Sequence, residues 1–400
     1  MQSLRVCHVI GSLDAGGAQA MLVKVLSRLG DRSVDSQVVS LMKRGPMGQP
    51  LRRLDVPVSF LGVRTLGDVP RAVLRLSRLL ADLQPDVVQT WLYYSDLVGG
   101  LAAKLAPSRP PVVWNIRTNA LVAGIHRPSL LTTARMCAWL SSSLPARIVV
   151  NSVSGLQWHA RFGYDRSRLQ LIRNGFDTER FRPSELARRA IRRQLGLPDS
   201  VRLVGMISSV RPQKDHATFL DAAALLAHQL PDVRFLLCGD GAVWQNESLR
   251  LMIEQRRLTD RIHLLGLRGD MPVVQASLDV AVLASVVEGF PNAIGEAMAC
   301  GVPCVVTDVG DSADLVGDVG FVVPRGDAVG LAQRCRELLT LPPDQSRERG
   351  LRSRLRIRRL FDLERVVEDY VALWHEVARR RFAVSPGQGR RDGTPPRRAA

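Results

Sequence analysis

The segment from Glu288 to Gly301, EGFPNAIGEAMACG, constrains the fold of this 400-residue chain more than any other stretch. An apolar run at 279–285 precedes it, and a second apolar run at 302–307 follows it. Both runs are typical of buried strands, and the residues between them predict a short helix that ends at Gly301. Glu288 is therefore expected in a loop at the carboxyl end of a strand, and Glu296 early in the next helix.

This placement indicates a ligand site. In open α/β sheets, ligands bind at the carboxyl ends of the strands. The start of a helix offers free backbone N–H groups to an anion. The carboxylates of Glu288 and Glu296 are unsuited to hold that anion, but they accept hydrogen bonds from sugar hydroxyls. A glycosidase acid/base pair is an alternative for the two glutamates, but it leaves the helix start without a role.

Short apolar runs alternate with helical patterns along the chain, which predicts parallel sheets with helices on both faces. One unit opens with a strand at 4–10 and a second with a strand at 201–207. The boundary falls between about 176 and 198, a stretch that carries prolines and arginines. A long amphipathic helix is expected at 361–381, followed by a Pro-, Gly- and Arg-rich tail at 382–400 that composition predicts to be disordered.

The net charge of +17 favours anionic partners, such as an anionic membrane face or a phosphorylated lipid. Nucleic acid is disfavoured, because aromatic residues make up only 5% of the chain and no RNA- or DNA-binding motif is present. Arginine-rich composition from genome bias is the simpler alternative. No run reaches the roughly 20 apolar residues of a membrane span, and the N-terminus lacks a signal-peptide core, so we expect a cytoplasmic protein.

The six cysteines are scattered, and most lie in apolar elements. Cys300 and Cys304 have a spacing that occurs in metal sites, but neither a second pair nor a histidine partner follows them. Reduced structural thiols are therefore expected rather than zinc ligands.

Four further segments accompany the Glu288 segment. They are Gly16-Gly17-Ala18-Gln19 after the first strand, residues 174–177 (NGFD), residues 208–215 (SSVRPQKD) and residues 302–308 (VPCVVTD). These segments occur in the same order as in glycosyltransferase family 4, a family of retaining enzymes with the GT-B fold. From about residue 5 to 325 the chain resembles this family, and in particular its bacterial exopolysaccharide and cell-surface polysaccharide members.

The resemblance implies an α/β protein with two Rossmann-like domains that face each other across a cleft. Residues 1–180 would form the acceptor-side domain and residues 181–360 the nucleotide-sugar domain. The helix at 361–381 would cross back to the first domain, and residues 382–400 would form the basic tail.

The resemblance also assigns roles to the donor-side residues. Arg211 and Lys214 would stabilise the leaving diphosphate, because cations placed there stabilise the transition state more than the ground state. Glu288 would act with them by contacting the transferred sugar. Glu296 would bind the ribose, and Phe290, Pro291 and Asn292 would present backbone N–H groups to the sugar and phosphate. Gly16 and Gly17 would let the loop after the first strand approach the donor closely, and Leu267 would lie beside the nucleotide base.

The chain departs from the family pattern at 86–96, where many members carry histidines and this chain carries none of its seven. Gln89 and Trp91 are the nearest matches, and Tyr94 follows. We expect Trp91, Tyr94 and Arg117 on the acceptor side. Core packing is the alternative for Trp91, and a donor contact or a structural ion pair for Arg117.

The sequence thus predicts an enzyme that transfers a hexose, with retention, from a UDP- or GDP-linked sugar to a lipid-linked saccharide at the inner face of the plasma membrane. No cofactor and no metal are expected, because no Asp-x-Asp motif stands at a suitable place. Two alternatives stay open: a transferase with a small soluble acceptor, and a non-catalytic module that binds sugar or polyanions.

Overall fold

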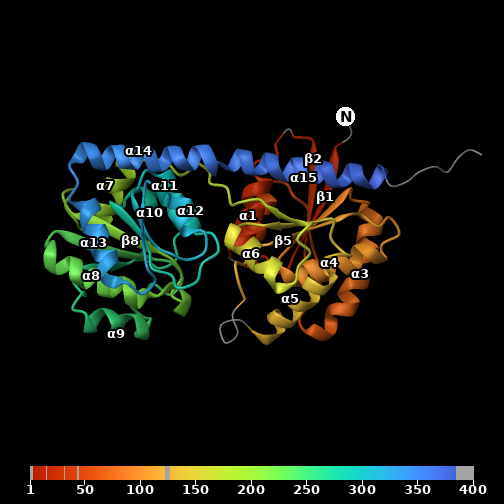
Figure 1. Cartoon of the computed structure of the whole chain (residues 1–400), viewed down its shortest axis with the longest axis horizontal. Coiled ribbons are helices and arrows are strands. Elements are labelled where there is room, and N and C mark those ends of the chain that lie inside the picture. The colour runs from red at the N-terminus through yellow and green to blue at the C-terminus, as the bar shows by residue number, and fades with distance from the viewer. Residues whose placement is uncertain (1–2, 15, 31, 43–44, 122–126, 384–400) are drawn as a thin grey trace, which may run out of the picture.

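The computed structural model describes residues 3–14, 16–30, 32–42, 45–121 and 127–383. Two α/β domains lie side by side (Figure 1). The first is built on a seven-stranded sheet of order β3-β2-β1-β4-β5-β6-β7, and the second on a six-stranded sheet of order β10-β9-β8-β11-β12-β13. Neighbouring strands in both sheets are parallel, so the predicted fold class is confirmed.

The first domain contains strands whose apolar residues are buried on both faces, as expected for a parallel sheet covered by helices. Residues 153–162 form a helix whose N-cap is Ser152, since the Ser152 hydroxyl accepts a hydrogen bond from the Gly155 N–H at 3.1 Å. The strands are β1 (Leu4–Ile10), β2 (Val34–Ser40), β3 (Val58–Phe60), β4 (Val87–Trp91), β5 (Val112–Ile116), β6 (Arg147–Val150) and β7 (Leu169–Leu171). The helices are α1 (Gly17–Leu26), α2 (Gly48–Arg53), α3 (Val69–Leu83), α4 (Tyr93–Leu105), α5 (Pro128–Leu140) and α6 (Val153–Phe162).

The second domain repeats the alternation of strand and helix. Its strands are β8 (Arg202–Ile207), β9 (Val233–Cys238), β10 (Ile262–Leu264), β11 (Val280–Leu283), β12 (Cys304–Thr307) and β13 (Phe321–Val323). Its helices are α7 (Glu185–Gln194), α8 (His216–Gln229), α9 (Glu247–Gln255), α10 (Met271–Ala276), α11 (Asn292–Ala299), α12 (Ser312–Val316), α13 (Ala328–Leu339) and α14 (Pro343–Leu360), with a 3₁₀ turn, η2 (Pro212–Lys214), after β8.

The chain passes between the domains twice at one place. Phe176 donates its N–H to the Phe361 carbonyl at 2.9 Å, and the Leu363 N–H returns a bond to the Phe176 carbonyl at 3.0 Å. The last helix, α15 (Leu363–Ala383), then runs along the first domain (Figure 1). There the Trp374 indole donates to the Gln89 amide oxygen at 2.8 Å, within a core shared with β1 and β4.

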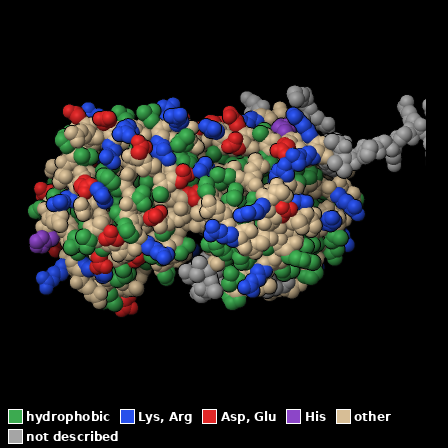
Figure 2. All heavy atoms as spheres, in the orientation of Figure 1, with side chains coloured by type: hydrophobic (Ala, Val, Ile, Leu, Met, Phe, Trp, Pro, Cys, Tyr) green, Lys and Arg blue, Asp and Glu red, His purple; other side chains and the backbone are tan. Residues whose placement is uncertain are grey.

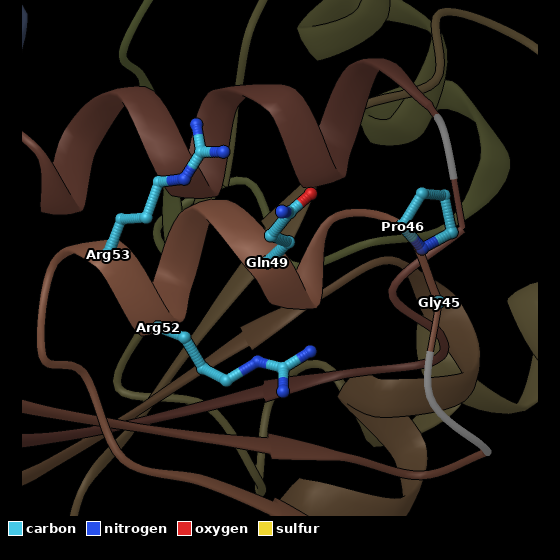
Figure 3. A pocket seen from close by; sticks show the side chains of 5 residues that line it. All are labelled: Gly45, Pro46, Gln49, Arg52 and Arg53. Carbon is cyan, nitrogen blue, oxygen red and sulfur yellow. The ribbon is translucent and has the colours of Figure 1, made fainter.

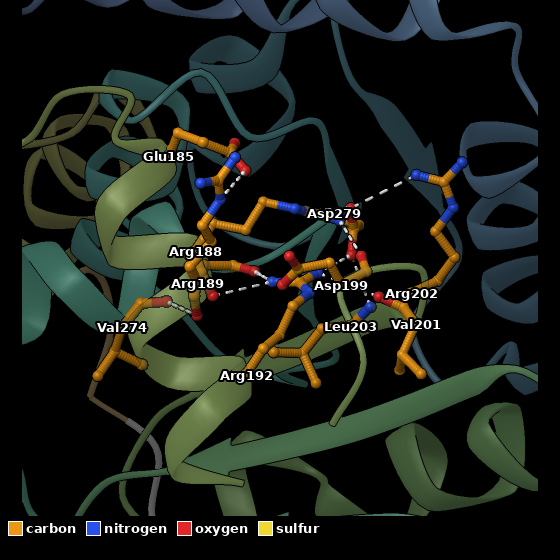
Figure 4. Close-up of polar contacts among 11 residues, drawn as sticks. Glu185, Arg188, Arg189, Arg192, Asp199, Val201, Arg202, Leu203, Val274 and Asp279 are labelled. Carbon is orange, nitrogen blue, oxygen red and sulfur yellow. Dashed lines mark hydrogen bonds and ion pairs between the residues drawn. The ribbon is translucent and has the colours of Figure 1, made fainter. Parts of the chain in front are cut away.

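Asp279 organises the base of the second domain (Figure 4). Its carboxylate accepts from Arg188 at 2.6 Å, from Arg192 at 2.7 Å and from the Leu203 N–H at 2.7 Å. Only 1% of the Arg192 side chain is exposed. The stretch that sequence analysis assigned to the domain boundary thus contains the helix α7, and its arginines bind the second sheet at the amino end of β11.

The six cysteines are all buried and unpaired, in agreement with the expectation of structural thiols. Burial raises their pKa values, to about 12 for Cys7 and Cys300 and to about 11 for Cys238. The thiols thus stay protonated and act as small apolar side chains.

The Asp279 contacts generate a stability prediction. Replacing Asp279 with Asn should lower the free energy of unfolding in urea by about 3–5 kcal/mol, because the buried Arg192 guanidinium then has no counter-charge. The control is Asp221→Asn, whose carboxylate pairs with Arg256 but is 51% exposed. That change should cost about 1 kcal/mol or less, and equal losses in the two variants would contradict the role given to Asp279.

Candidate active site

The carboxyl ends of the two sheets face one another, because the loop after β5 meets the loop after β11 and the loop after β6 meets the loop after β12. Between them lies a cavity of about 280 Å³. Its lining comes from both domains: Gly17, Ala18, Gln19, Leu92, Arg117, Asn151, Asn174, Glu288, Gly289, Phe290 and Asn292.

Glu288 and Lys214 come together at this edge, although 73 residues separate them in the sequence. Glu288 follows β11, Lys214 ends η2, and their side chains form an ion pair in which each is about one-fifth exposed. The Ser285 hydroxyl lies 3.3 Å from the same carboxylate. Gly310 packs directly against the backbone of the Glu288 loop. A side chain is excluded there, because its φ is +57° and a Cβ would stand 2.2 Å from the Glu288 carbonyl oxygen.

The segment after Glu288 has a mixed role. The Phe290 side chain is 4% exposed and stacks on Phe176, with ring centroids 6.1 Å apart, so only its backbone is available to a ligand. Pro291 precedes α11 and has no N–H, so the expectation that it faces the ligand as a donor is wrong. Asn292 begins α11, and the first N–H groups of this helix have no helical partners.

Glu296 lies one turn further along α11, and its carboxylate accepts from the Lys24 ammonium of α1 at 3.0 Å. The Lys24 ammonium also lies 5.9 Å from the ring centroids of Phe176 and Phe181. In this conformation Glu296 joins the two domains and does not line the cavity. Its role in ribose binding stays a prediction.

The remaining donor-side residues are placed as follows. Gly17 begins α1 at the cavity, where a Cβ would lie 3.7 Å from the Asn292 amide nitrogen, and Gly16 is the preceding N-cap. Arg211 is exposed at the start of η2. Leu267 is 76% exposed in the loop after β10 and does not line the cavity.

Trp91 is fully buried, so the expectation of an acceptor contact through this side chain is wrong and the alternative of core packing describes it. Its ring lies 6.2 Å from that of Tyr370 on α15. Gln89 is the partner of Trp374, which gives both residues of this unusual segment a structural role. Tyr94 is half-buried, and its hydroxyl donates to Ser129 at 2.9 Å.

Arg117 reaches the cavity, and the groups that it binds in the described part of the chain are neutral. Its guanidinium donates to the Tyr370 hydroxyl at 3.3 Å and to the side-chain oxygen of Asn174. Among the described residues no carboxylate lies within ion-pair distance of Arg117, so the alternative of a structural ion pair is wrong. Burial lowers the pKa of Arg117, as expected for a cation whose charge no neighbouring anion compensates.

Sequence reasoning missed several polar residues that close the cleft. Asn119 donates to the Glu288 carbonyl at 2.9 Å, and Asn174 donates to the Asn292 side-chain oxygen at 2.7 Å. Asp311, which follows β12, accepts from the Val153 and Ser154 N–H groups at 2.6 and 2.9 Å. It thereby caps α6 of the other domain. The signal that could have identified these residues in the sequence was their position after expected strands.

Comparisons with known proteins agree with this geometry. Residues 15–180 match the family model described as Glycosyltransferase Family 4, and residues 201–341 match the model described as Glycosyl transferases group 1. The chain therefore belongs to glycosyltransferase family 4 and is a glycosyltransferase.

One similar protein is the UDP-Gal:alpha-D-GlcNAc-diphosphoundecaprenol alpha-1,3-galactosyltransferase of Escherichia coli, 26% identical over 81% of this chain and 85% of its own length. Another is the D-inositol 3-phosphate glycosyltransferase of Salinispora tropica, 25% identical over 94% of this chain and 85% of its own length.

Among solved structures, HepE of Anabaena in complex with UDP-glucose superposes with a TM-score of 0.80 at 23% identity, covering 93% of this chain and 99% of that one. Sucrose-phosphate synthase of Thermosynechococcus elongatus gives a TM-score of 0.78 at 19% identity, covering 95% of this chain and 100% of that one. These similarities identify the GT-B fold.

The Lys214 position generates a prediction about turnover. Lys214→Met should lower the transfer rate by roughly 10²–10³, because one charged donor to the leaving group is lost, while the unfolding midpoint stays near that of the wild type. Initial rates with a nucleotide-sugar donor measure this effect. Lys104→Met, at the exposed end of α4, is the control. A Lys214 variant as fast as the control would refute the donor-side assignment.

Proposed function

We propose that the protein transfers a hexose, with retention of anomeric configuration, from a UDP- or GDP-linked sugar to a lipid-linked saccharide in cell-surface polysaccharide synthesis. The observation that carries the proposal is the meeting of Lys214, Glu288 and the start of α11 at one edge of the cleft. A nucleotide-sugar has a diphosphate for the cation and the helix start, and hydroxyls for the carboxylate.

In this proposal the chemistry depends on stabilising the leaving group. Lys214, Arg211 and the N–H groups at the start of α11 bind the diphosphate, which gains charge as the glycosidic bond breaks. Glu288 accepts hydrogen bonds from the transferred sugar and positions its anomeric carbon. Protein cations supply the positive charge, so we propose that neither a metal nor a cofactor takes part. Among the described residues, no three His, Cys, Asp or Glu side chains are grouped to hold a metal.

The surroundings of the cavity support the proposal of retention. The carboxylate that lines it, Glu288, is paired with Lys214 and is assigned to the sugar. It is thus poorly suited to act as a base that activates an acceptor on the opposite face of the sugar.

The names of similar proteins support the acceptor class. The relative from Escherichia coli acts, by its name, on a diphosphoundecaprenol-linked sugar, which favours a lipid-linked acceptor for this chain. The relative from Salinispora tropica is named for inositol 3-phosphate, so a small soluble acceptor is the second candidate. A non-catalytic binding module is disfavoured, because the chain keeps Arg211, Lys214, Glu288 and Glu296.

A donor screen followed by product analysis tests the proposal. UDP- or GDP-sugars should raise the unfolding temperature, since a ligand at about 100 times its dissociation constant adds roughly 2.7 kcal/mol of stability. Proton NMR should then show an α linkage in the product of an α-linked donor. A β linkage, or a donor preference outside UDP and GDP, would contradict the corresponding part of the proposal.

We further propose that the enzyme works in the cytoplasm, bound peripherally to the inner membrane face. The net charge of +17 supports an anionic partner, and Figure 2 shows basic side chains spread over both domains. Within the described part of the chain, no helix has both the length and the apolar character needed to span a membrane.

The first domain offers a docking surface for that membrane beside α2. There a pocket of about 540 Å³ is lined by Gly45, Pro46, Gln49, Arg52 and Arg53, with both arginine side chains projecting from the helix (Figure 3). Among the described residues, neither arginine has an acidic partner within ion-pair distance. Nearby, Met42 is 43% exposed and Phe60 is 36% exposed. Cations beside exposed apolar groups suit an anionic bilayer surface.

Liposome cosedimentation tests the membrane proposal. The wild type should bind anionic vesicles at low salt and dissociate at high salt, because each basic residue contributes about 1 kcal/mol that salt screens. Replacing Arg52 and Arg53 with Gln should weaken binding by roughly tenfold or more. The control replaces Arg325 and Arg336, exposed on the second domain. Binding that ignores salt would contradict electrostatic docking, and binding lost only when residues 384–400 are removed would assign the contact to the tail.

A further inference from the structure

We propose that Arg117 binds a phosphate group of the acceptor on the first-domain wall of the cleft, and that Tyr370 of the terminal helix is the positioning residue that holds Arg117 there. This inference rests on the proposed function, since it adds the acceptor's phosphate to a donor site already assigned to the second domain. The acceptor would thus be a sugar phosphate or a sugar diphosphate, and not a neutral saccharide.

The charges around the cavity are the first argument. Two charged side chains line it, Glu288 and Arg117. Glu288 is already paired with Lys214, so the positive charge of Arg117 remains unmatched. The start of α1 at Gly17 adds the positive end of a ten-residue helix that has no acidic residue in its first turn. A partly desolvated cavity with an unmatched positive charge and the positive end of a helix favours binding of an anion.

Polar atoms beside Arg117 suit the sugar to which such a phosphate is attached. Asn151 is 4% exposed and lines the cavity, and its side-chain oxygen has no hydrogen-bond partner among the described residues. A buried oxygen without a donor is costly, and a hydroxyl group of a ligand would satisfy it. The guanidinium and the free amide oxygen together match a phosphate with a neighbouring sugar ring.

Tyr370 fixes the orientation of the guanidinium. Its hydroxyl accepts from Arg117 at 3.3 Å and from the Asn115 amide at 2.9 Å. The Arg117 guanidinium carbon lies 5.7 Å from the centroid of the Trp91 ring, which supports it from beneath. Tyr370 is fully buried, and burial raises its pKa, so the hydroxyl is neutral and leaves the charge of Arg117 available to a ligand.

The two possible sources of the phosphate are the donor and the acceptor, and position favours the acceptor. Arg211 and Lys214 on the second domain already provide two cations for the donor diphosphate. Arg117 follows β5 of the first domain, on the opposite wall, beside Asn151 after β6. An acceptor that enters against the first domain places its own phosphate at that wall.

Calorimetric titration of the full chain with inorganic pyrophosphate, with and without saturating UDP, tests the proposal. UDP occupies the donor site, so pyrophosphate that still binds reports a separate anion subsite. We expect the wild type to bind it, Arg117→Gln to bind it about tenfold or more weakly, and Tyr370→Phe to weaken it by roughly threefold to tenfold. The affinity for UDP should stay within about threefold in both variants, a separation that general destabilisation would not produce.

The matched control is Tyr164→Phe, which removes another buried hydroxyl, one that donates to the Ala134 carbonyl at 3.2 Å. It should bind pyrophosphate and UDP as the wild type does. The proposal is overturned if pyrophosphate binds only without UDP, if Arg117→Gln binds it normally, or if the variant loses UDP and pyrophosphate equally. A normal Tyr370→Phe overturns the positioning role. If the wild type binds no nucleoside diphosphate, the proposed function fails, and titrations without UDP still test Arg117.

Discussion

The arrangement of the cleft depends on how α15 is seated in the first domain. Trp374 donates to Gln89 in β4, and the Tyr370 hydroxyl accepts from Asn115 in β5 and from Arg117 directly after it. These bonds form between residues more than 250 positions apart. Because α15 continues from the second domain, its docking fixes where the second sheet stands relative to the first. The distance between the two carboxyl edges, and with it the size of the cavity, follows from this contact.

A continuous chain of hydrogen bonds extends from this helix across the cleft. Tyr370 binds Arg117, Arg117 binds Asn174, and Asn174 binds Asn292 at the start of α11. The chain thus connects the terminal helix, the first domain, the crossing segment and the second domain. A ligand that draws Arg117 or Asn292 toward itself competes with these bonds, so binding and domain movement are expected to be coupled.

Two ion pairs stabilise the charged groups at the edge of the cleft. Lys214 with Glu288, and Lys24 with Glu296, place each carboxylate against a cation. Pairing lowers the cost of keeping these charges in a partly buried cleft. A nucleotide-sugar that binds Lys214 through phosphate and Glu288 through a hydroxyl replaces one set of charge-assisted bonds by another. The site therefore holds its charged groups in place before any ligand arrives.

The fold was predictable where local chemistry decides the structure. The strands near residues 4–10 and 201–207, and the Glu288 loop before a short helix, follow from apolar spacing and glycine placement. Prediction failed for α7, because its arginines look solvated until Asp279, about 90 residues later, is seen to pair with them. It failed for Trp91 for the same reason, since the ring that covers it comes from α15. Short strands such as β3 and β13 carry too few residues to show a pattern.

The Glu288 and Lys214 segments of the candidate site were more visible in the sequence than the single polar residues that close the cleft. Glu288, Lys214 and Asn292 lie in short segments with a distinctive order. Asn151, Asn174 and Asp311 act through single amides or carboxylates that any loop can carry, and their partners lie on other strands or on the other domain. Sequence shows that such residues follow strands, but only the packed structure shows which of them face one another.

The buried thiols have a practical consequence. All six cysteines are enclosed and hold their protons far above neutral pH, so maleimide reagents should leave the native protein unlabelled. One new cysteine on the surface of each domain would then accept a pair of fluorophores without background. Energy transfer between the dyes would follow the opening and closing of the two sheets in real time, in an enzyme whose own residues already provide a silent surface for the measurement.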